Sequence, residues 1–508
     1  SVTVRFRTPF SNGSDLTGYE LIYEDEERQK LAINFKLDDS GNADTHSVSK
    51  ELSTCTVQGL PAGSILHDVR VRAKNLAGWG EYSLEPLTVM TAGKLVAWGD
   101  NDFGQLGVSE QMMNHSLTDV QQTFDLRVED MACGSAHSVI LSDGKVFTWG
   151  QNKHGQLGRF TSEVDFQRGE VELSGFFSIQ TGSAIPGVND ELSGMISVEI
   201  LRQDGPSDYL GSLGPTAKTD GKCVQVAAGY NFSMALTDRG EIFVFGEGRH
   251  GVLAQGDELS KSSPQVIDSL SVPGYVVDKI FCGERHCACI VRYGQALTWG
   301  CGSDGQLGHS SRDDEHFPRK VEHLANVSVR TISCGSKHTC FLTSDNSLYT
   351  CGNGKDGKLG HGDERSYLYP KKVETLQAVK EVSCGDYHTA CIDGKSIIYT
   401  FGSGTRGQLG YKFDEIKGFR TYSTLGSNTY GTWKSLLPKA VISLHQNEID
   451  GFRQLRCGPT CTFAVSNDNG LWCWGEGPQI DSIFGAKMHL YEPKKVTKFH
   501  KFHVSEIT

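Results

Sequence analysis

Short β-type runs of mainly apolar side chains, some of which alternate with threonine, recur along most of the chain, and each ends in an aromatic residue or cysteine followed by glycine. Most of these runs lead into a turn similar to Gly-Gln-Leu-Gly. Alternation with a period of two indicates β-strands rather than helices. The seven runs begin at Val96, Phe147, Phe243, Leu297, Tyr349, Tyr399 and Leu471.

A second pattern precedes each run from the second one onward. It consists of a small residue, a glycine turn and another alternating stretch, as in SCGSKHTCFL from Ser333 and SCGDYHTACI from Ser383. A short turn, such as Ser142-Asp143-Gly144, then leads into the aromatic-glycine run. Two alternating stretches joined by a tight polar turn predict a β-hairpin.

The repeat unit is about 50 residues long. Trp98 to Trp149 spans 51 residues, Trp299 to Cys351 spans 52, and Cys351 to Phe401 spans 50. A unit of this length with several short strands and no helical periodicity is typical of a propeller blade. One blade cannot cover its own apolar faces, so the seven units require one another.

Taken together, the patterns C-G-x-x-H-(S/T) and W-G-x-(G/N)-x-x-G-Q-L-G resemble the regulator of chromosome condensation repeat over residues 93 to 508. This resemblance implies a seven-bladed β-propeller. The third repeat departs from the pattern with Phe232 at the histidine position and GVLA from Gly251 in the second motif. The seventh has Cys461 at the histidine position and a distant Ile483-Phe484-Gly485.

The first unit has the aromatic-glycine strand but no Cys-Gly hairpin before it. The chain ends on KFHVSEIT, which is similar to the segments that precede the other Cys-Gly turns. We therefore expect the C-terminal strand to pair with the first blade, as the family's closure by chain ends implies, and the natural chain to continue beyond Thr508. A closed ring would leave no strand edges at the join.

Residues 1 to 92 lack the repeat and contain alternating strands between Pro- and Gly-rich turns, which predicts a β-sandwich. The segment VRVRAKNLAGWGEYS from Val69 and the run YELIY from Tyr19 resemble a fibronectin type III domain. Phe6 stands where that family has a core Trp, and His67 where it has a corner Tyr. The first strand of the domain is expected to be missing. The predicted fold class is all-β, a sandwich followed by a propeller.

The amino-acid composition limits the classes of partner that the chain is expected to bind. The formal net charge is −12, which argues against a nucleic-acid surface because phosphate contacts require clustered Lys and Arg. No apolar run of 18 residues is present, so we expect no membrane partner. The chain is expected to be intracellular and cytoplasmic.

Cysteines 133, 282, 334, 384 and 457 recur at one repeat position, and we expect small buried thiols suited to a reducing compartment. Each Cys-Gly-x-x-His pair belongs to a different blade, and Phe232 and Cys461 break the set, so no metal is predicted. His137 with Ser138 and Asp143 can be drawn as a catalytic triad. However, this hairpin recurs in other repeats, which favours a structural role. We expect no enzyme activity and no cofactor.

Two insertions interrupt the regular spacing of the repeats, at about 159–221 and 412–452. The first contains VELSGFFSIQTG and DELSGMISVEILRQDG, which we interpret as a protruding hairpin or two edge strands; the second surrounds Trp433. Function on a repeat scaffold is often grafted onto such departures. The candidate partner contacts are Phe176, Phe177, Ile179, Met195, Ile196, Ile200, Tyr430 and Trp433.

These features support two functional hypotheses. In the first, the chain is a non-enzymatic protein–protein interaction scaffold within a large multidomain intracellular assembly, a cytoskeletal or ciliary complex being one setting by analogy. In the second, the propeller is a guanine-nucleotide exchange factor for a small GTPase, as the family's founding member is for Ran. The 159–221 insertion would then be the wedge. The attached sandwich favours the scaffold. A light-sensing propeller is disfavoured because no Trp follows the Cys-Gly pairs.

Overall fold

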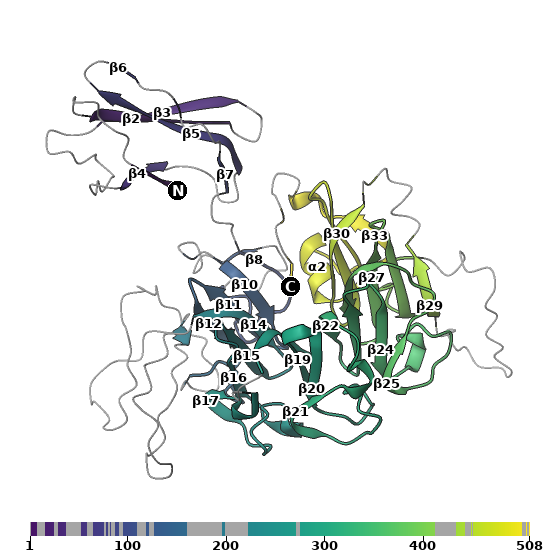
Figure 1. Ribbon diagram of the computed structural model, residues 1–508. Helices are drawn as coiled ribbons and strands as arrows, with labels where there is room; N and C mark the ends of the chain where they lie inside the picture. Colours follow the sequence, from purple (N-terminus) through teal and green to yellow (C-terminus); the bar gives the residue numbers. More distant parts are fainter. Residues whose placement is uncertain are drawn as a thin grey trace, which may run out of the picture. The chain divides into compact units, whose positions relative to one another are not determined.

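A computed structural model of the chain (Figure 1) resolves into two compact units, Ser1–Leu95 and Val96–Thr508, which are described separately. It describes residues 2–7, 16–24, 29–36, 52–57, 65–75, 78–79, 82, 87–90, 95–108, 118–120, 126, 128–159, 196–198, 222–270, 275–411, 433–441, 449, 451–499, 504 and 507–508. Among these residues we find no helix with both the length and the apolar character of a membrane span.

The N-terminal unit is built from two antiparallel sheets. One pairs β1 (Val2–Arg7) with β4 (Leu52–Val57), and the other has the order β3-β2-β5-β6, with β7 also paired to β5. Tyr19, Leu21 and Tyr23 are buried at alternate positions of β2, as expected for a strand with one face on a core. The remaining strands are β2 (Leu16–Glu24), β3 (Lys30–Lys36), β5 (Ile65–Asn75), β6 (Gly78–Trp79) and β7 (Leu87–Met90).

The second unit contains, among its described residues, six four-stranded sheets and the two-stranded pair β8 (Val96–Ala97) and β9 (Thr118–Asp119). Each four-stranded sheet is an antiparallel meander in sequence order. First strands of successive sheets contact one another, so the sheets radiate from a common axis. These inner strands are β10 (Val128–Cys133), β14 (Cys223–Ala228), β18 (Val277–Cys282), β22 (Val329–Cys334), β26 (Val379–Cys384) and β30 (Phe452–Cys457).

The second and third strands are the predicted hairpins. The second strands are β11 (His137–Ser142), β15 (Phe232–Thr237), β19 (His286–Val291), β23 (His338–Thr343), β27 (His388–Asp393) and β31 (Cys461–Ser466). The third strands are β12 (Lys145–Gly150), β16 (Ile242–Gly246), β20 (Gln295–Gly300), β24 (Leu348–Gly352), β28 (Ile398–Ser403) and β32 (Leu471–Glu476).

The fourth strands form the outer edges of the sheets, and five of them carry a proline. They are β13 (Ile196–Val198), β17 (Lys261–Val266), β21 (Glu315–Lys320), β25 (Tyr367–Lys372), β29 (Lys434–Ala440) and β33 (His489–Lys495). Proline offers no N–H to a further strand, so it blunts an exposed edge. These prolines are Pro264, Pro318, Pro370, Pro438 and Pro493.

The apolar core of the propeller lies between neighbouring blades, in what we call the seams. Met234 and Val244 of one blade pack with Ile280, Cys289 and Trp299 of the next, and all are at most a few per cent exposed. Because each sheet buries its faces against two neighbours, stability depends on the array as a whole.

The two ends of the propeller chain meet the blade β30–β33. Trp98 and Val504 pack against that blade's core cluster, of which Ile507 is a buried member. The rings of Trp98 and Phe463 lie edge to face, 5.9 Å apart, and Arg453 donates to the Val504 carbonyl. The predicted pairing of the C-terminal strand with the first blade falls mostly outside the described residues and stays a prediction.

Both predicted insertions contain a blade strand. β13 pairs with β12 (Val146 opposite Val198), and β29 pairs with β28 (Tyr399 opposite Ala440). In sequence, the additional residues therefore lie on both sides of a fourth strand. In the seventh repeat, Ile483 and Phe484 end the helix α2 (Pro478–Phe484), which stands in place of a Gly-Gln-Leu-Gly turn.

Candidate functional site

All the repeat motifs gather at one end of the blades, which we call the motif face. It is formed by the turns that join first to second strands, such as 283–285, and by the loops that follow third strands, such as 301–308. The tight turns between second and third strands, which include Tyr293, lie at the opposite end.

The motif histidines bridge adjacent blades. His286 Nε2 lies 2.8 Å from Thr339 Oγ1 in the next blade, and that hydroxyl donates to the Gln306 carbonyl at 2.7 Å. Because the threonine uses its only hydrogen on the carbonyl, it must accept from the histidine. The imidazole therefore carries its proton on Nε2 and keeps a lone pair on Nδ1.

We call this arrangement the seam latch. In each further case a histidine of one blade meets the Ser or Thr that follows the histidine position of the next, and that hydroxyl donates to a carbonyl of the preceding blade. The other latches are His137 with Ser233 at 2.9 Å, His338 with Thr389 at 2.9 Å and His388 with Thr462 at 2.8 Å. Their hydroxyls donate to the carbonyls of Gln156, Lys358 and Gln408 at 2.9, 2.8 and 3.0 Å.

The seam after Phe232 shows what happens where the histidine is absent. The partner position in the next blade is Cys287, whose thiol lies 3.5 Å from the Val252 carbonyl. Phe232 and Cys287 belong to one buried cluster, so an apolar ring and a weakly polar thiol take the places of the imidazole and the hydroxyl, and no hydroxyl is left without a partner. Sequence reasoning missed the hydroxyl as a partner, although the joint loss of His and Ser/Thr in adjacent repeats was a usable signal.

Burial also lowers the pKa values of three of these histidines. It lowers the pKa of His137 to about 4 and those of His286 and His388 to about 3, because the charged form is cut off from water. Ser138 donates to the Gln105 carbonyl at 2.8 Å, whereas His137 Nε2 is bonded to Ser233. The two side chains of the drawn triad thus have different partners.

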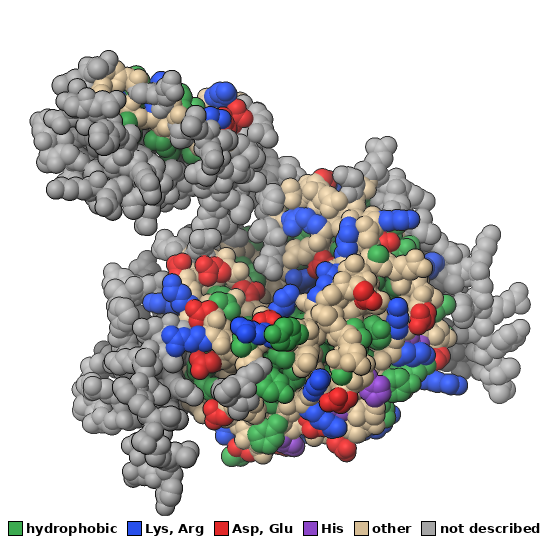
Figure 2. Space-filling model, in the orientation of Figure 1, with side chains coloured by type: hydrophobic (Ala, Val, Ile, Leu, Met, Phe, Trp, Pro, Cys, Tyr) green, Lys and Arg blue, Asp and Glu red, His purple; other side chains and the backbone are tan. Residues whose placement is uncertain are grey.

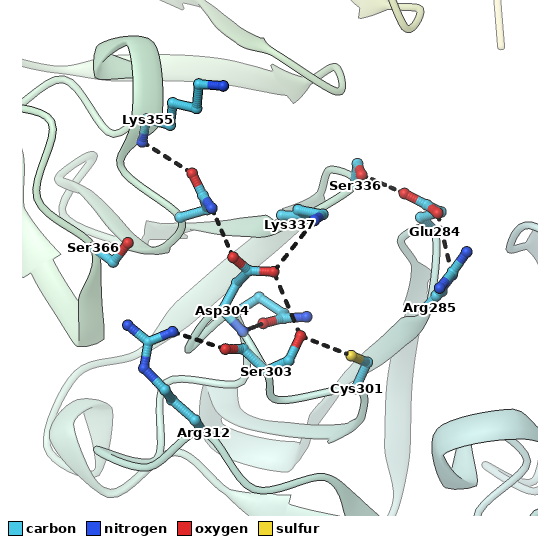
Figure 3. A network of polar contacts seen from close by, with 12 residues as sticks. Glu284, Arg285, Cys301, Ser303, Asp304, Arg312, Ser336, Lys337, Lys355 and Ser366 are labelled. Carbon is cyan, nitrogen blue, oxygen red and sulfur yellow. Dashed lines mark hydrogen bonds and ion pairs between the residues drawn. The ribbon is translucent and has the colours of Figure 1, made fainter.

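A polar network covers part of the motif face (Figure 3). Asn353 donates to Asp304 Oδ1 at 2.6 Å, Lys337 lies 3.7 Å from Asp304 Oδ2, and Ser336 donates to Glu284. Arg285 forms an ion pair with Glu284 at 3.2 Å. These groups come from neighbouring blades, so the network ties adjacent turns together while keeping charged side chains at the surface.

Two tyrosines of the motif face are exposed beside this network. Tyr230 is 47% exposed and Tyr387 is 50% exposed, each in the turn before a motif position. Figure 2 shows acidic, basic and hydrophobic side chains intermingled on the visible face of the propeller. Half-exposed aromatic rings among mixed charges are typical of protein-binding surfaces.

Two groups of potential metal ligands occur among the described residues. His338, Cys340 and Cys384 lie in one seam, and His250, Cys301 and Asp314 lie in another; within each, the ligand atoms are at most 4.8 Å apart. In the first group, motif residues of two blades meet because His338 of one blade reaches Cys384, which ends the first strand of the next blade.

The predicted contact residues have different positions. Phe176, Phe177, Ile179, Met195, Ile200 and Tyr430 lie outside the described residues. Ile196 begins β13 and pairs with Thr148, so its backbone belongs to a blade. Trp433 is 9% exposed and stacks on Tyr491 at 5.4 Å. That burial argues against a direct partner contact by Trp433: the ring is part of the core, where it anchors the start of β29.

Comparisons with known proteins agree with the architecture. The Arabidopsis thaliana ultraviolet-B receptor UVR8 is 29% identical over 281 residues, 55% of this chain and 53% of that protein. The human E3 ubiquitin-protein ligase HERC2 is 33% identical over 295 residues, 58% of this chain but 5% of that protein. The chain thus spans about half the length of the first relative and a small part of the second.

Solved structures show the same fold. Human WBSCR16 has a TM-score of 0.59 at 20% identity, covering 79% of this chain and 93% of that one. Prp20p of Saccharomyces cerevisiae has a TM-score of 0.60 at 20% identity, covering 79% and 86%. These matches confirm the predicted seven-bladed propeller. The family model described as the RCC1-like domain matches residues 94–508, and the chain belongs to that family.

Proposed function

We propose that this chain is a non-enzymatic protein–protein interaction module that binds its partner on the motif face. The supporting observation is that the recurrent polar residues are hydrogen-bonded to one another inside the propeller, whereas two tyrosines of the motif face are exposed. The motif histidines and hydroxyls bond to each other in the seam latches, whereas Tyr230 and Tyr387 are half exposed beside charged turns. Side chains that are buried and bonded to each other are poorly placed to act on a substrate. Exposed aromatic rings, by contrast, favour contact with another protein.

The finer parts of this proposal concern its setting. In one sheet β2 pairs with β3 and β5, and β5 also pairs with β7; in the other, β1 pairs with β4. These pairings support a fibronectin type III-like sandwich for the N-terminal unit. The fourteen cysteines with described side chains are unpaired, which suits a reducing intracellular compartment. A large multidomain assembly is proposed on the same grounds, and a cytoskeletal or ciliary setting rests on analogy alone.

Affinity purification with mass spectrometry tests the proposal. The variant Tyr230→Ala/Tyr387→Ala should lose most of the captured partner, because both rings lie on the motif face. Tyr293→Ala is the matched control, since Tyr293 is 89% exposed at the opposite end of its blade. Equal capture by both variants would contradict a partner site on the motif face.

The insertions provide further candidate contacts. Phe176, Phe177 and Ile179 with Met195, Ile196 and Ile200 supply apolar side chains in the first, and Tyr430 in the second. Deleting 176–192 spares β13, which the blade needs. Unchanged partner capture after this deletion would exclude that segment as a contact.

A second candidate function is guanine-nucleotide exchange on a small GTPase, with the 159–221 insertion acting as the wedge. It is favoured by the likeness to Prp20p, whose structure was described together with its binding to Gsp1p and histones. A nucleotide-release assay over a panel of small GTPases tests it. Accelerated release that is lost on deleting 176–192 would establish exchange activity and overturn the purely scaffolding role.

A further inference from the structure

We propose that the seam between the blades β22–β25 and β26–β29 is a binding site for one thiophilic metal ion of the Zn²⁺ class, held by His338 Nδ1, Cys340 Sγ and Cys384 Sγ. The three ligand atoms lie within 4.8 Å of one another. His338 and Cys340 are two residues apart on β23, so both project from the same face of that strand. Cys384 ends β26 in the next blade.

The seam latch prepares the histidine for this role. His338 Nε2 is bonded to Thr389 Oγ1 at 2.9 Å, and that hydroxyl donates to the Lys358 carbonyl at 2.8 Å. The proton is thereby fixed on Nε2, which leaves Nδ1 as a lone pair. This nitrogen is buried and makes no hydrogen bond of normal geometry. An outer hydrogen bond that fixes tautomer and ring orientation is the usual support of a metal-bound histidine.

Only one of the described seams supplies the third ligand. His286 faces a seam with Cys334, and His388 one with Cys457, but the position of Cys340 is occupied there by Ala288 and Ala390. Those seams therefore offer one nitrogen and one sulfur. The additional thiol at Cys340 converts a repeated pair into a set of one imidazole and two thiols, which is a soft donor set that Zn²⁺ accepts.

Charge balance favours a divalent ion. Binding replaces the two thiol protons with one Zn²⁺ and releases two protons, so the occupied site carries no net charge. This matters because His338 and Cys340 are fully buried and Cys384 is 8% exposed, and a net charge would be costly there. The Ser333 carbonyl lies 3.3 Å from Cys384 Sγ and places an oxygen beside the same site.

The other group of potential ligands is less suited to a metal. Asp314 accepts from the Gly302 amide at 2.8 Å and lies 2.7 Å from His250 Nδ1, so two of its three members are already paired with each other. It also contains a single thiol, Cys301. The set around Cys340 is the better thiophilic site.

The test measures metal content of the full chain after exposure to Zn²⁺ and removal of excess by gel filtration. We expect roughly one Zn²⁺ per chain, lost in Cys340→Ala, which restores the residue of the neighbouring blades. Cys289→Ala removes an equally buried thiol from another seam and should keep the metal. Equal zinc in wild type and Cys340→Ala, or none in wild type, would overturn the proposal.

A second measurement on the unmodified chain covers the case in which Cys340→Ala does not fold. Co²⁺ added in place of Zn²⁺ should give a thiolate-to-cobalt charge-transfer band that equimolar Zn²⁺ removes. Absence of this band in the folded protein would overturn the site, independently of any partner-binding result.

Discussion

In each seam latch the Ser or Thr hydroxyl accepts a hydrogen bond from the histidine of the preceding blade and donates one to a carbonyl of that same blade, so one side chain satisfies two buried groups. Thr339 lies between His286 Nε2 and the Gln306 carbonyl. Gly385 shows how tightly such a latch is built. A Cβ at this position would lie 2.6 Å from His388 Cε1 and 2.5 Å from the Gly458 carbonyl, so only glycine fits.

Replacing Thr339 with valine keeps the shape of the side chain but removes its hydroxyl. His286 Nε2 and the Gln306 carbonyl would each lose a partner while buried, so we expect the free energy of unfolding to fall by about 2–4 kcal/mol. Urea unfolding followed by tryptophan fluorescence measures this. Thr405→Val, at an exposed site, is the control and should change it by less than about 0.5 kcal/mol.

Ala254 occupies a position at which other repeats have glycine, and its φ is +55°. Alanine pays a steric cost in this left-handed region that glycine avoids. We therefore expect Ala254→Gly to raise the free energy of unfolding by about 0.5–1 kcal/mol, less any gain in entropy of the unfolded chain. A lower unfolding midpoint in the same urea titration would contradict this reading of the turn.

Among the elements, the outer strands show the clearest protection against association. Pro318 in β21 and Pro370 in β25 stand directly after Phe317 and Tyr369, which are exposed apolar residues on the same edges. Without these prolines, each edge would present an additional N–H beside an apolar side chain.

The double variant Pro318→Val/Pro370→Val should therefore self-associate at concentrations at which the natural chain is dispersed. Analytical ultracentrifugation measures the shift toward larger species. The control Phe317→Ser/Tyr369→Ser, added to the same background, should reverse it. A double variant that sediments like the natural chain would show that proline is not what protects these edges.

Element-level prediction succeeded where the pattern was periodic and failed where spacing changed. The hairpin strands β19, β23 and β27 follow directly from alternation next to a Cys-Gly turn. The spacing assigns β13 and β29 to insertions because the chain between third and fourth strands is longer there. The segment SLLPKAV from Ser435 does match YLYPKKV from Tyr367, a signal that identifies β29.

At the scale of the whole molecule, the succession of blades can be predicted from the sequence, whereas the side-chain contacts in the seams between blades cannot. Repeat spacing reveals seven units, but it does not show which side chains meet across a boundary between them. The partnership of His388 with Thr462 joins residues 74 positions apart and depends on the rotation between blades. For the same reason the sequence does not reveal that Trp433, a predicted partner contact, packs between Tyr411 and Tyr491.

Acid should weaken the propeller through its buried histidines. His137, His286 and His388 have folded pKa values of about 4, 3 and 3, below the ordinary value of 6.5. The unfolded chain binds more protons between these limits, so stability is complete above pH 6.5 and is lost as pH falls toward the folded values. We expect about 2 kcal/mol per histidine between pH 7 and pH 5 in urea unfolding. A stability unchanged over this range would contradict the burial.

The central claim is that the recurring histidines and hydroxyls exist to join blades, and a double-mutant cycle at His388 and Thr462 tests it directly. The natural seam of Phe232 and Cys287 supplies the substitutions His388→Phe and Thr462→Cys. Each single change should lower the free energy of unfolding by about 2 kcal/mol or more, and the double change should restore part of the loss, with a coupling of about 1–3 kcal/mol. Additive effects, with a coupling below about 0.3 kcal/mol, would contradict the account.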